Sequence, residues 1–417
     1  MRALLFAIGS VGDVFPFLAL GRGLQERGWQ VTVAASPVHA ASIAQAGCKL
    51  EPMGSEEDYH RMTSNPELWK PRQGMRVILG DSGAAGMVRQ QRDLTRAFVS
   101  GSGRSVVVAS TLAFGARVAR DEMAFPLITT HLAPVVIRCH RQPPVLTRAF
   151  PEGWIVRLWP SLAYRMIDRR IADPLLAPLV EPLRAEAGLA PARRYMNGWW
   201  HSPDRIMLLF PRWLGSPPSL PDRAIHTGFL FHDDVKSHDN NPALYQYLND
   251  GPPPVAITLG SAMRHGRALL ERTVQACTAM GQRLLILSKD SEQVPASLPN
   301  TVFHSRWAPM DTTLPRCAAL IHHGGVGTMA RVFQAGIPQI VIPFCHDQPD
   351  NSDRVSRLGA GAWVSPNSVL RGGLKKVLKK VLNHPDMRDR CHALAAEISH
   401  KMAIDKACSV VAETKAT

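Results

Sequence analysis

The stretch Ile321-His322-His323-Gly324-Gly325-Val326-Gly327-Thr328 contains three glycines in four positions. It follows an apolar run, Ala318 to Ile321, that predicts a strand, and it precedes Met329 to Ala335, which predicts a helix ending at Gly336 and Pro338. A glycine-rich turn therefore leads from a strand into a helix, which is one step of an α/β domain.

This turn is suited to hold an anion. Glycines lack Cβ atoms, so Gly324, Gly325 and Gly327 allow backbone N–H groups to approach a phosphate, and a helix N-terminus presents unpaired donors. His322 and Thr328 add side-chain donors. The stretch has neither the lysine of a P-loop nor the G-x-G-x-x-G pattern. From these residues alone, an anion site and a merely tight turn both remain open.

Composition limits the class of protein and of partner. A chain of 417 residues with 45% hydrophobic and 20% charged residues predicts two globular domains. The net charge of +14 favours anionic partners such as phosphorylated substrates, fatty acids or membrane surfaces, although for the charge alone a basic soluble protein with no such partner is the better interpretation. We find no zinc-finger spacing and no RNA-binding aromatic signature, so we expect no nucleic-acid partner.

The cysteines and the apolar runs bear on location. Seven scattered cysteines without a C-x-x-C pair predict neither a disulfide framework nor a structural zinc site, which fits the cytoplasm. Asp13 interrupts the apolar opening, so we expect no signal peptide, and no run is long enough to span a bilayer. We expect at most a peripheral contact at the inner face of the cell membrane.

Along the chain, strands and helices alternate in two series. The first, residues 1–232, begins with a strand at Ala3 to Ile8 and a helix from Val14, and we interpret it as an open, doubly wound α/β domain. Its Trp- and Arg-rich part, 132–213, is a natural place for an apolar pocket. We expect a linker at 233–253, a second doubly wound domain at 254–395, and a last helix at 396–417 that packs back at the domain junction.

Three further positions of the second domain follow predicted strands, where open α/β sheets bind ligands. They are Gly260-Ser261, Trp307-Ala308 and the segment that contains Asp347-Gln348. Together with the glycine-rich turn they describe a nucleotide-sugar site: an aromatic face for a base, donors for a diphosphate, and polar groups for sugar hydroxyls. Asp347 could alternatively be a helix N-cap.

With these motifs, the chain resembles the family-1 glycosyltransferases of the GT-B architecture, which have two Rossmann-like domains facing each other across a cleft. The residues that carry the likeness are His322, Gly324, Gly325, Gly327 and Thr328, the pair Asp347-Gln348, and the N-terminal run Gly9 to Pro16. Within the family, Ile8 to Phe17, Trp200 to Pro203 and His346 to Asn351 look most similar to the rhamnosyltransferases of rhamnolipid synthesis.

The resemblance implies an inverting transferase with no metal site and no cofactor besides its donor, dTDP-L-rhamnose or a related nucleotide-sugar. It implies Asp13 as the base that deprotonates the acceptor hydroxyl, although Asp13 could also be an N-cap, and His39 and His131 are rival bases. We assign the donor to the positions named above and to Gly12. The acceptor is assigned to Phe15, His131, Trp199 and Trp200, with Arg138, Arg141, Arg169 and Arg170 as candidates to attract a carboxylate.

The resulting functional hypothesis is transfer of rhamnose to a 3-(3-hydroxyalkanoyloxy)alkanoic acid, a lipophilic hydroxy acid, to give a mono-rhamnolipid. The synthase of that lipid precursor is then a candidate partner protein. One alternative is a UDP-glucose or dTDP-deoxysugar transferase acting on a polyketide, a sterol or another lipophilic acceptor. Another is a catalytically silent helper protein, against which the presence of Asp13, His322 and Asp347-Gln348 argues.

Overall fold

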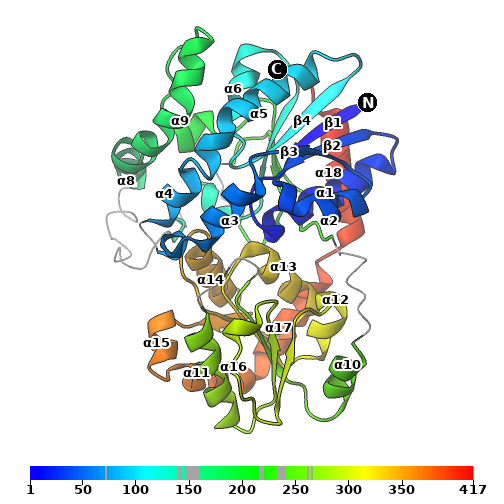
Figure 1. The fold of residues 1–417 in the computed structure, drawn as a ribbon, viewed down its shortest axis with the longest axis vertical. Coiled ribbons are helices and arrows are strands. Elements are labelled where there is room, and N and C mark those ends of the chain that lie inside the picture. The colour runs from blue at the N-terminus through cyan, green and yellow to red at the C-terminus, as the bar shows by residue number, and fades with distance from the viewer. Residues whose placement is uncertain are drawn as a thin grey trace. The chain divides into compact units, whose positions relative to one another are not determined.

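The computed structural model describes residues 1–70, 73–139, 143–145, 160–215, 220–232, 241–260, 263 and 266–416. It divides into two compact units (Figure 1). The first contains Met1–His232 together with Ser399–Thr417, and the second contains Asp233–Ile398. Both units are α/β, as the sequence predicts.

The first unit is built on a parallel sheet with strand order β3-β2-β1-β4-β5-β6-β7. Its strands are β1 (Arg2–Phe6), β2 (Gln30–Ala35), β3 (Lys49–Pro52), β4 (Ser105–Ser110), β5 (Leu127–His131), β6 (Arg205–Leu208) and β7 (Ala224–His226). Its helices are α1 (Val11–Gln25), α2 (Ala40–Gln45), α3 (Glu56–Ser64), α4 (Gly74–Leu79), α5 (Ala84–Val99), α6 (Phe114–Glu122), α8 (Pro160–Ile167), α9 (Asp173–Glu186) and α18 (His400–Glu413). Shorter helical turns are η1 (Pro37–His39), η2 (Pro66–Trp69), η3 (Pro134–Val136) and the π-helical η4 (Asp168–Ala172) and η5 (Tyr195–Trp199).

The second unit has a parallel sheet of order β10-β9-β8-β11-β12-β13. Its strands are β8 (Val255–Thr258), β9 (Leu284–Leu287), β10 (Val302–Ser305), β11 (Ala319–His322), β12 (Gln339–Val341) and β13 (Gly361–Trp363). Its helices are α10 (Pro242–Asn249), α11 (Arg267–Thr278), α12 (Met310–Thr313), α13 (Val326–Ala335), α14 (Gln348–Arg357), α15 (Pro366–Leu370), α16 (Leu374–Leu382) and α17 (Pro385–Ala396), with the short turns η7 (Ser291–Gln293) and η8 (Leu314–Arg316).

In both sheets the strand order reverses beside the first strand of the unit. In the first unit the chain runs outward from β1 through β2 and β3 and then resumes on the other side at β4; in the second unit β8 and β11 are the corresponding neighbours. Loops that leave the carboxyl ends of two such strands diverge to opposite faces, and the crevice between them is where open α/β sheets bind ligands. The segment after β1 and the glycine-rich turn after β11 both lie at such a point.

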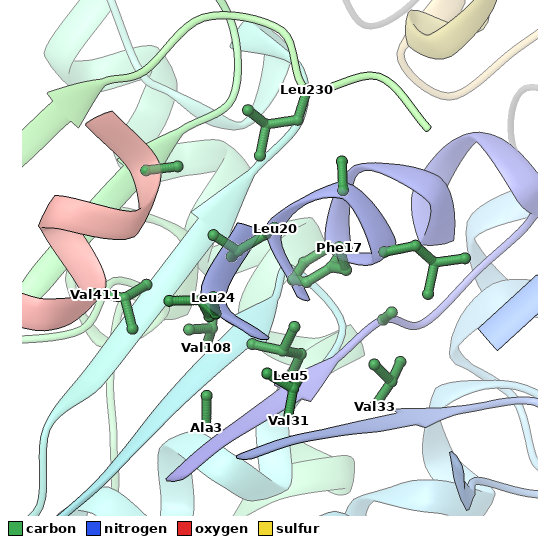
Figure 2. Close-up of a cluster of buried hydrophobic side chains, with 14 of the residues drawn as sticks. Ala3, Leu5, Phe17, Leu20, Leu24, Val31, Val33, Val108, Leu230 and Val411 are labelled. Carbon is green, nitrogen blue, oxygen red and sulfur yellow. The ribbon is translucent and has the colours of Figure 1, made fainter. Parts of the chain in front are cut away.

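The core of the first unit joins both ends of the chain. Leu5, Phe17 and Leu24 belong to one buried cluster with Val411 of α18 (Figure 2). A Cβ on Gly23 of α1 would come within 2.7 Å of the Ile404 side chain, so the two helices are in close contact at that point. The C-terminal helix is therefore part of the first unit's core.

The structure differs from the sequence interpretation in three places. Residues 242–249, expected as part of a linker, form α10, which is capped by Asn241 and buries Leu244 and Leu248 in the second unit; residues 233–240 lie outside the described residues. Helix α1 begins at Val11 rather than Val14. The final helical region is split, since α17 ends at Ala396 and α18 begins at His400.

All seven cysteines are free and buried, and none of the described helices is long and apolar enough to cross a membrane.

Candidate active site

The glycine-rich turn of the second unit connects β11 to α13 at the point where the strand order reverses. Gly324 has φ +94°, and a Cβ there would lie 2.8 Å from Val341, so only glycine fits. Gly325 is the N-cap of α13, and the first turn of α13 contains no acidic side chain. The expected helix N-terminus is thus present, and Gly327 and Thr328, both partly exposed, lie within its first turn.

His322 is completely buried, and both of its ring nitrogens are engaged. Its Nε2 is 3.0 Å from Oε1 of Gln339, and its Nδ1 accepts a hydrogen bond from the backbone N–H of Gly324 at 3.1 Å. Burial lowers the pKa of His322 to about 3, with a further contribution from His323. The neutral ring therefore holds the turn in shape, and a direct contact with a diphosphate, as expected from the sequence, requires exchange of the Gln339 bond.

The neighbouring ring, His323, lies against two glycines. A Cβ on Gly260 would come within 2.6 Å of this ring, and one on Gly325 within 2.3 Å. Burial lowers the pKa of His323 to about 4, and among the described residues its Nδ1 has no hydrogen-bond partner. Gly260, which has φ +90°, therefore lies beside the glycine-rich turn, as expected from the sequence; Ser261 lies outside the described residues.

The start of α14 is tied to the same turn. Asn351, with no exposed surface, donates from Nδ2 to the carbonyl oxygen of Gly324 and to Oδ2 of Asp347, both at 2.8 Å. Gln348 turns its Oε1 to the backbone N–H of Phe344 at 2.9 Å. Asp347 is at the N-cap position of α14, in agreement with the alternative interpretation from the sequence, but its side chain makes no capping hydrogen bond.

Trp307 and Ala308 follow β10, further along the same edge of the sheet. Trp307 is partly exposed, and its carbonyl oxygen accepts a hydrogen bond from Ser305 at 2.5 Å, while Ala308 is buried in the core of the unit. Trp307 is therefore only partly covered, and Ala308 contributes to the core. Gly12 lies in α1 of the first unit, so its assignment to the donor stays a prediction.

This edge can bind an anion through backbone N–H groups and a helix N-terminus. No group of three His, Cys, Asp or Glu side chains that could hold a metal occurs among the described residues.

Comparison with known proteins agrees with this geometry. Residues 3–139 match the Glycosyltransferase family 28 N-terminal domain, and residues 271–412 match the Erythromycin biosynthesis protein CIII-like, C-terminal domain. The O-mycaminosyltylonolide 6-deoxyallosyltransferase of Streptomyces fradiae is 28% identical over 426 residues, which cover 100% of this chain and 99% of that protein. The protein is a glycosyltransferase with the GT-B fold.

Two solved structures share the fold of the glycosyltransferase. The glycosyltransferase of kitacinnamycin superposes with a TM-score of 0.73 at 20% identity, covering 99% of this chain and 98% of that one. The spinosyn rhamnosyltransferase SpnG, complexed with thymidine diphosphate, has a TM-score of 0.68 at 18% identity, covering 98% of this chain and 100% of that one.

The first unit of the glycosyltransferase positions Asp13 at the start of α1. Its Oδ2 accepts hydrogen bonds from the backbone N–H of Ser10 at 2.8 Å and from the Ser10 hydroxyl at 2.9 Å. Asp13 is thus the third helical residue of a capping box rather than the N-cap. Burial raises the pKa of the Asp13 carboxyl above its usual value, although the two bonds from Ser10 act in the opposite direction.

Gly9 and His39 support this carboxylate. Gly9 has φ +139°, and a Cβ there would lie 2.4 Å from Oδ2 of Asp13, so the residue must be glycine. The Nε2 of buried His39 is 3.2 Å from the Gly9 carbonyl, which can only accept, so this nitrogen carries the proton. His39, a rival base from the sequence, therefore positions the Gly9 turn.

Two of the predicted acceptor residues, His131 and Trp200, lie at the carboxyl end of β5 and in the segment before β6. His131 is completely buried, with Nε2 3.0 Å from Nδ1 of His201 and Nδ1 3.1 Å from the Thr111 hydroxyl. Burial holds the pKa of His131 well below its ordinary range and lowers that of His201 to about 4. Trp200 has its ring edge toward His131 at a centroid distance of 6.4 Å. The structure thus brings His131 and Trp200 together.

The other predicted acceptor residues have separate surroundings. Trp199 donates from Nε1 to Asp121 at 2.8 Å and stacks with Arg117, inside an ion-pair network. Phe15 packs edge-on against His232 at 5.2 Å. Arg138 forms a two-pronged ion pair with buried Asp168, so its charge is already neutralised. Arg169 and Arg170 are exposed, and Arg141 lies outside the described residues.

Three residues were not assigned from the sequence: Gln339, Asn351 and His323. Gln339 is the first residue of β12 and faces β11, a pairing that cannot be read from one strand alone. Asn351 lies four residues after Asp347, and this spacing brings two side chains onto one helix face, so helical periodicity could have found it.

Proposed function

We propose that this glycosyltransferase transfers L-rhamnose, from dTDP-L-rhamnose, to a hydroxyl group of a lipophilic acceptor. The observation that carries the proposal is the edge of the second unit where the glycine-rich turn, the N-terminus of α13 and the start of α14 are joined through Asn351. Backbone donors suit the diphosphate, and the segment beginning at Asp347 suits sugar hydroxyls.

The donor is inferred from the relatives. One relative is named a 6-deoxyallosyltransferase, and a structural neighbour named a rhamnosyltransferase was solved with thymidine diphosphate. Both names favour a 6-deoxyhexose, and the second favours a thymidine nucleotide.

For the reaction we assign Asp13 as the base. The acceptor hydroxyl oxygen attacks the anomeric carbon from the side opposite the diphosphate, the C1–O bond to the diphosphate breaks, and the hydroxyl proton passes to Asp13. Inversion at C1 follows from the single displacement. The charge that grows on the departing diphosphate is stabilised by the N–H donors of the turn and of α13, so we assign no step to a metal.

Two acceptors are candidates. The first is a 3-(3-hydroxyalkanoyloxy)alkanoic acid, which would give a mono-rhamnolipid. It is supported by the likeness of Ile8 to Phe17 and Trp200 to Pro203 to rhamnosyltransferases of rhamnolipid synthesis, and a negatively charged acid fits the net charge of +14. The second is a hydroxyl of a polyketide, favoured by the macrolide substrate in the name of the S. fradiae relative. For the first acceptor, a contact with the synthase of the lipid precursor and a peripheral position at the membrane are part of the proposal.

The test is nucleoside diphosphate release by the purified full chain. dTDP-rhamnose and UDP-glucose are each supplied with a hydroxyacyloxy fatty acid, with a macrolide aglycone, or with no acceptor. We expect release that needs both dTDP-rhamnose and the fatty acid. Release that needs the macrolide instead of the fatty acid would replace the proposed acceptor. Release with UDP-glucose but not with dTDP-rhamnose would overturn the proposed donor.

A further inference from the structure

Exposed apolar side chains of the first unit gather on one short segment. Among the described residues seven large apolar side chains are exposed, and three of them lie within ten positions: Leu162, Met166 and Ile171, with exposed fractions of 50%, 53% and 48%. Large apolar groups scattered singly over a surface need no explanation, but a cluster indicates an interaction site. Figure 1 shows α8, the first part of this segment, at the periphery of the first unit.

The segment has two distinct faces. Ala163, Tyr164, Asp168 and Ala172 are buried, each exposing 8% of its surface or less. The exposed residues recur at intervals of three and four positions, so they share the other, outward side of the helix: Leu162, Arg165, Met166, Arg169 and Arg170. We call this outward side the α8 face; it consists of Leu162, Arg165, Met166, Arg169 and Arg170, and Ile171 is exposed in the π-helical turn that follows.

The α8 face carries positive charge and no negative charge. The acidic residue of 160–172, Asp168, points inward and is paired with Arg138. No ion pair to Arg165, Arg169 or Arg170 is found within the described parts of the chain. Three guanidinium groups with no ion pair to a described residue thus share this face with the aliphatic side chains of Leu162 and Met166.

The exposure of these side chains does not come from a loosely held helix. Tyr164 donates its hydroxyl proton to the Cys139 carbonyl at 2.8 Å, and the Arg138 guanidinium lies 4.8 Å from the centre of the Tyr164 ring. Together with the Asp168 pair, these contacts fix the inner side of the segment. The outer apolar side chains are therefore exposed to solvent on a helix whose inner side is fixed by these contacts.

A second basic helix, α16 of the second unit, provides a contrast. Its lysines Lys375, Lys376, Lys379 and Lys380 are exposed, but its apolar residues Leu374, Leu378 and Val381 are buried in the unit. The outer side of α16 is therefore an ordinary charged, solvent-exposed helix face. The α8 face differs because aliphatic and cationic groups share one surface.

We propose that the α8 face docks on a membrane surface rich in anionic phospholipid. Aliphatic side chains insert at the level of the acyl boundary, while arginines bind lipid phosphates in the two-pronged manner that a guanidinium allows. Docking would bring the enzyme to the phase in which a lipophilic acceptor partitions. The inference does not depend on which acceptor is used.

The experiment is sedimentation of the full chain with vesicles of phosphatidylcholine alone and of phosphatidylcholine with phosphatidylglycerol. We expect binding to the anionic vesicles that weakens with salt. The triple change Leu162→Ser, Met166→Ser, Ile171→Ser and the single change Arg165→Glu should each lower the partition coefficient about tenfold. The control Lys376→Glu with Lys380→Glu on α16 should change it less than twofold.

The proposal is overturned if the α8 variants bind like the unchanged chain, or if the α16 variant loses binding equally. It is also overturned if sedimentation velocity shows a dimer that the triple variant abolishes, because the α8 face then covers a second copy. Thermal unfolding confirms that the variants are folded. Nucleoside diphosphate release with a water-soluble acceptor should be unchanged in the triple variant, which separates loss of docking from failure of the proposed reaction.

Discussion

Asn351 joins helix α14 to the glycine-rich turn, because its Nδ2 donates to the Gly324 carbonyl oxygen at 2.8 Å. The same nitrogen holds Oδ2 of Asp347 at 2.8 Å. One buried amide thus fixes the turn proposed for the diphosphate relative to the segment proposed for the sugar.

Changing Asn351 to Ala should weaken donor binding and stability together. It leaves the buried Gly324 carbonyl without this donor, which destabilises by about 1–3 kcal/mol. Thermal unfolding with and without dTDP measures both effects. The control is Ser352→Ala, one residue on in the same helix, whose hydroxyl donates to the Pro349 carbonyl at 2.8 Å; it should keep the dTDP affinity. Equal dTDP affinity in both variants would contradict the role of the Asn351 tether.

The change Asp13→Asn should abolish transfer while dTDP binding persists. The amide keeps the shape of the side chain but cannot take the acceptor proton, and loss of a general base typically lowers the rate about 10²- to 10⁴-fold. Single-turnover transfer and dTDP titration measure the two properties separately. Turnover near the unchanged rate would remove Asp13 as the base.

The change Ser10→Ala should move the pH dependence of kcat/KM. The base acts when ionised, so the rate falls as the pH drops through the Asp13 pKa, which burial raises. The Ser10 hydroxyl lowers that pKa through its bond to Oδ2, so removing it raises the pKa further. We therefore expect the acidic limb to shift to higher pH while the plateau rate is retained. If the acidic limb of the profile does not shift, the group that titrates there is not Asp13.

The change Gly260→Ala should disturb the donor site, whereas Gly281→Ala should not. Both glycines have positive φ, +90° and +64°, so both substitutions strain the backbone by about 1–2 kcal/mol. Only the Cβ at Gly260 meets the His323 ring, at 2.6 Å; at Gly281 the space is open. We expect a lower unfolding midpoint and weaker dTDP binding in the first variant than in the second. Matching dTDP affinities would mean that the position of His323 does not affect the donor.

Much of the architecture could be predicted because it is local in the sequence. Uninterrupted apolar runs such as Ala3 to Phe6 and Ala319 to Ile321 are buried strands of parallel sheets, and Leu374 to Leu382 is the amphipathic helix that its pattern indicates. The sequence predicts the start of α1 at Val14, three residues late, because the bonds between Ser10 and Asp13 extend the helix to Val11.

The parts that could not be predicted depend on contacts between distant segments. His322 looked like a ligand donor, since nothing in its own stretch indicates that Gln339, on the neighbouring strand, takes up its Nε2. Arg138 looked like a free cation, but Asp168 neutralises it across a separation of 30 residues. The polar stretch before Val255 looked like a linker, and only the burial of Leu244 and Leu248 against the second sheet makes it a helix of that unit.

The packing of α18 against α1 also bears on synthesis of the chain. A ribosome releases the strands of the first unit early, but the apolar side of α1 has no α18 to pack on until residues 400–413 have emerged. The second unit, whose residues are contiguous, can complete its core before that. The unit that is translated first can therefore complete its core only after the last residues are made, and until then the part of α1 that packs on α18 leaves apolar surface exposed.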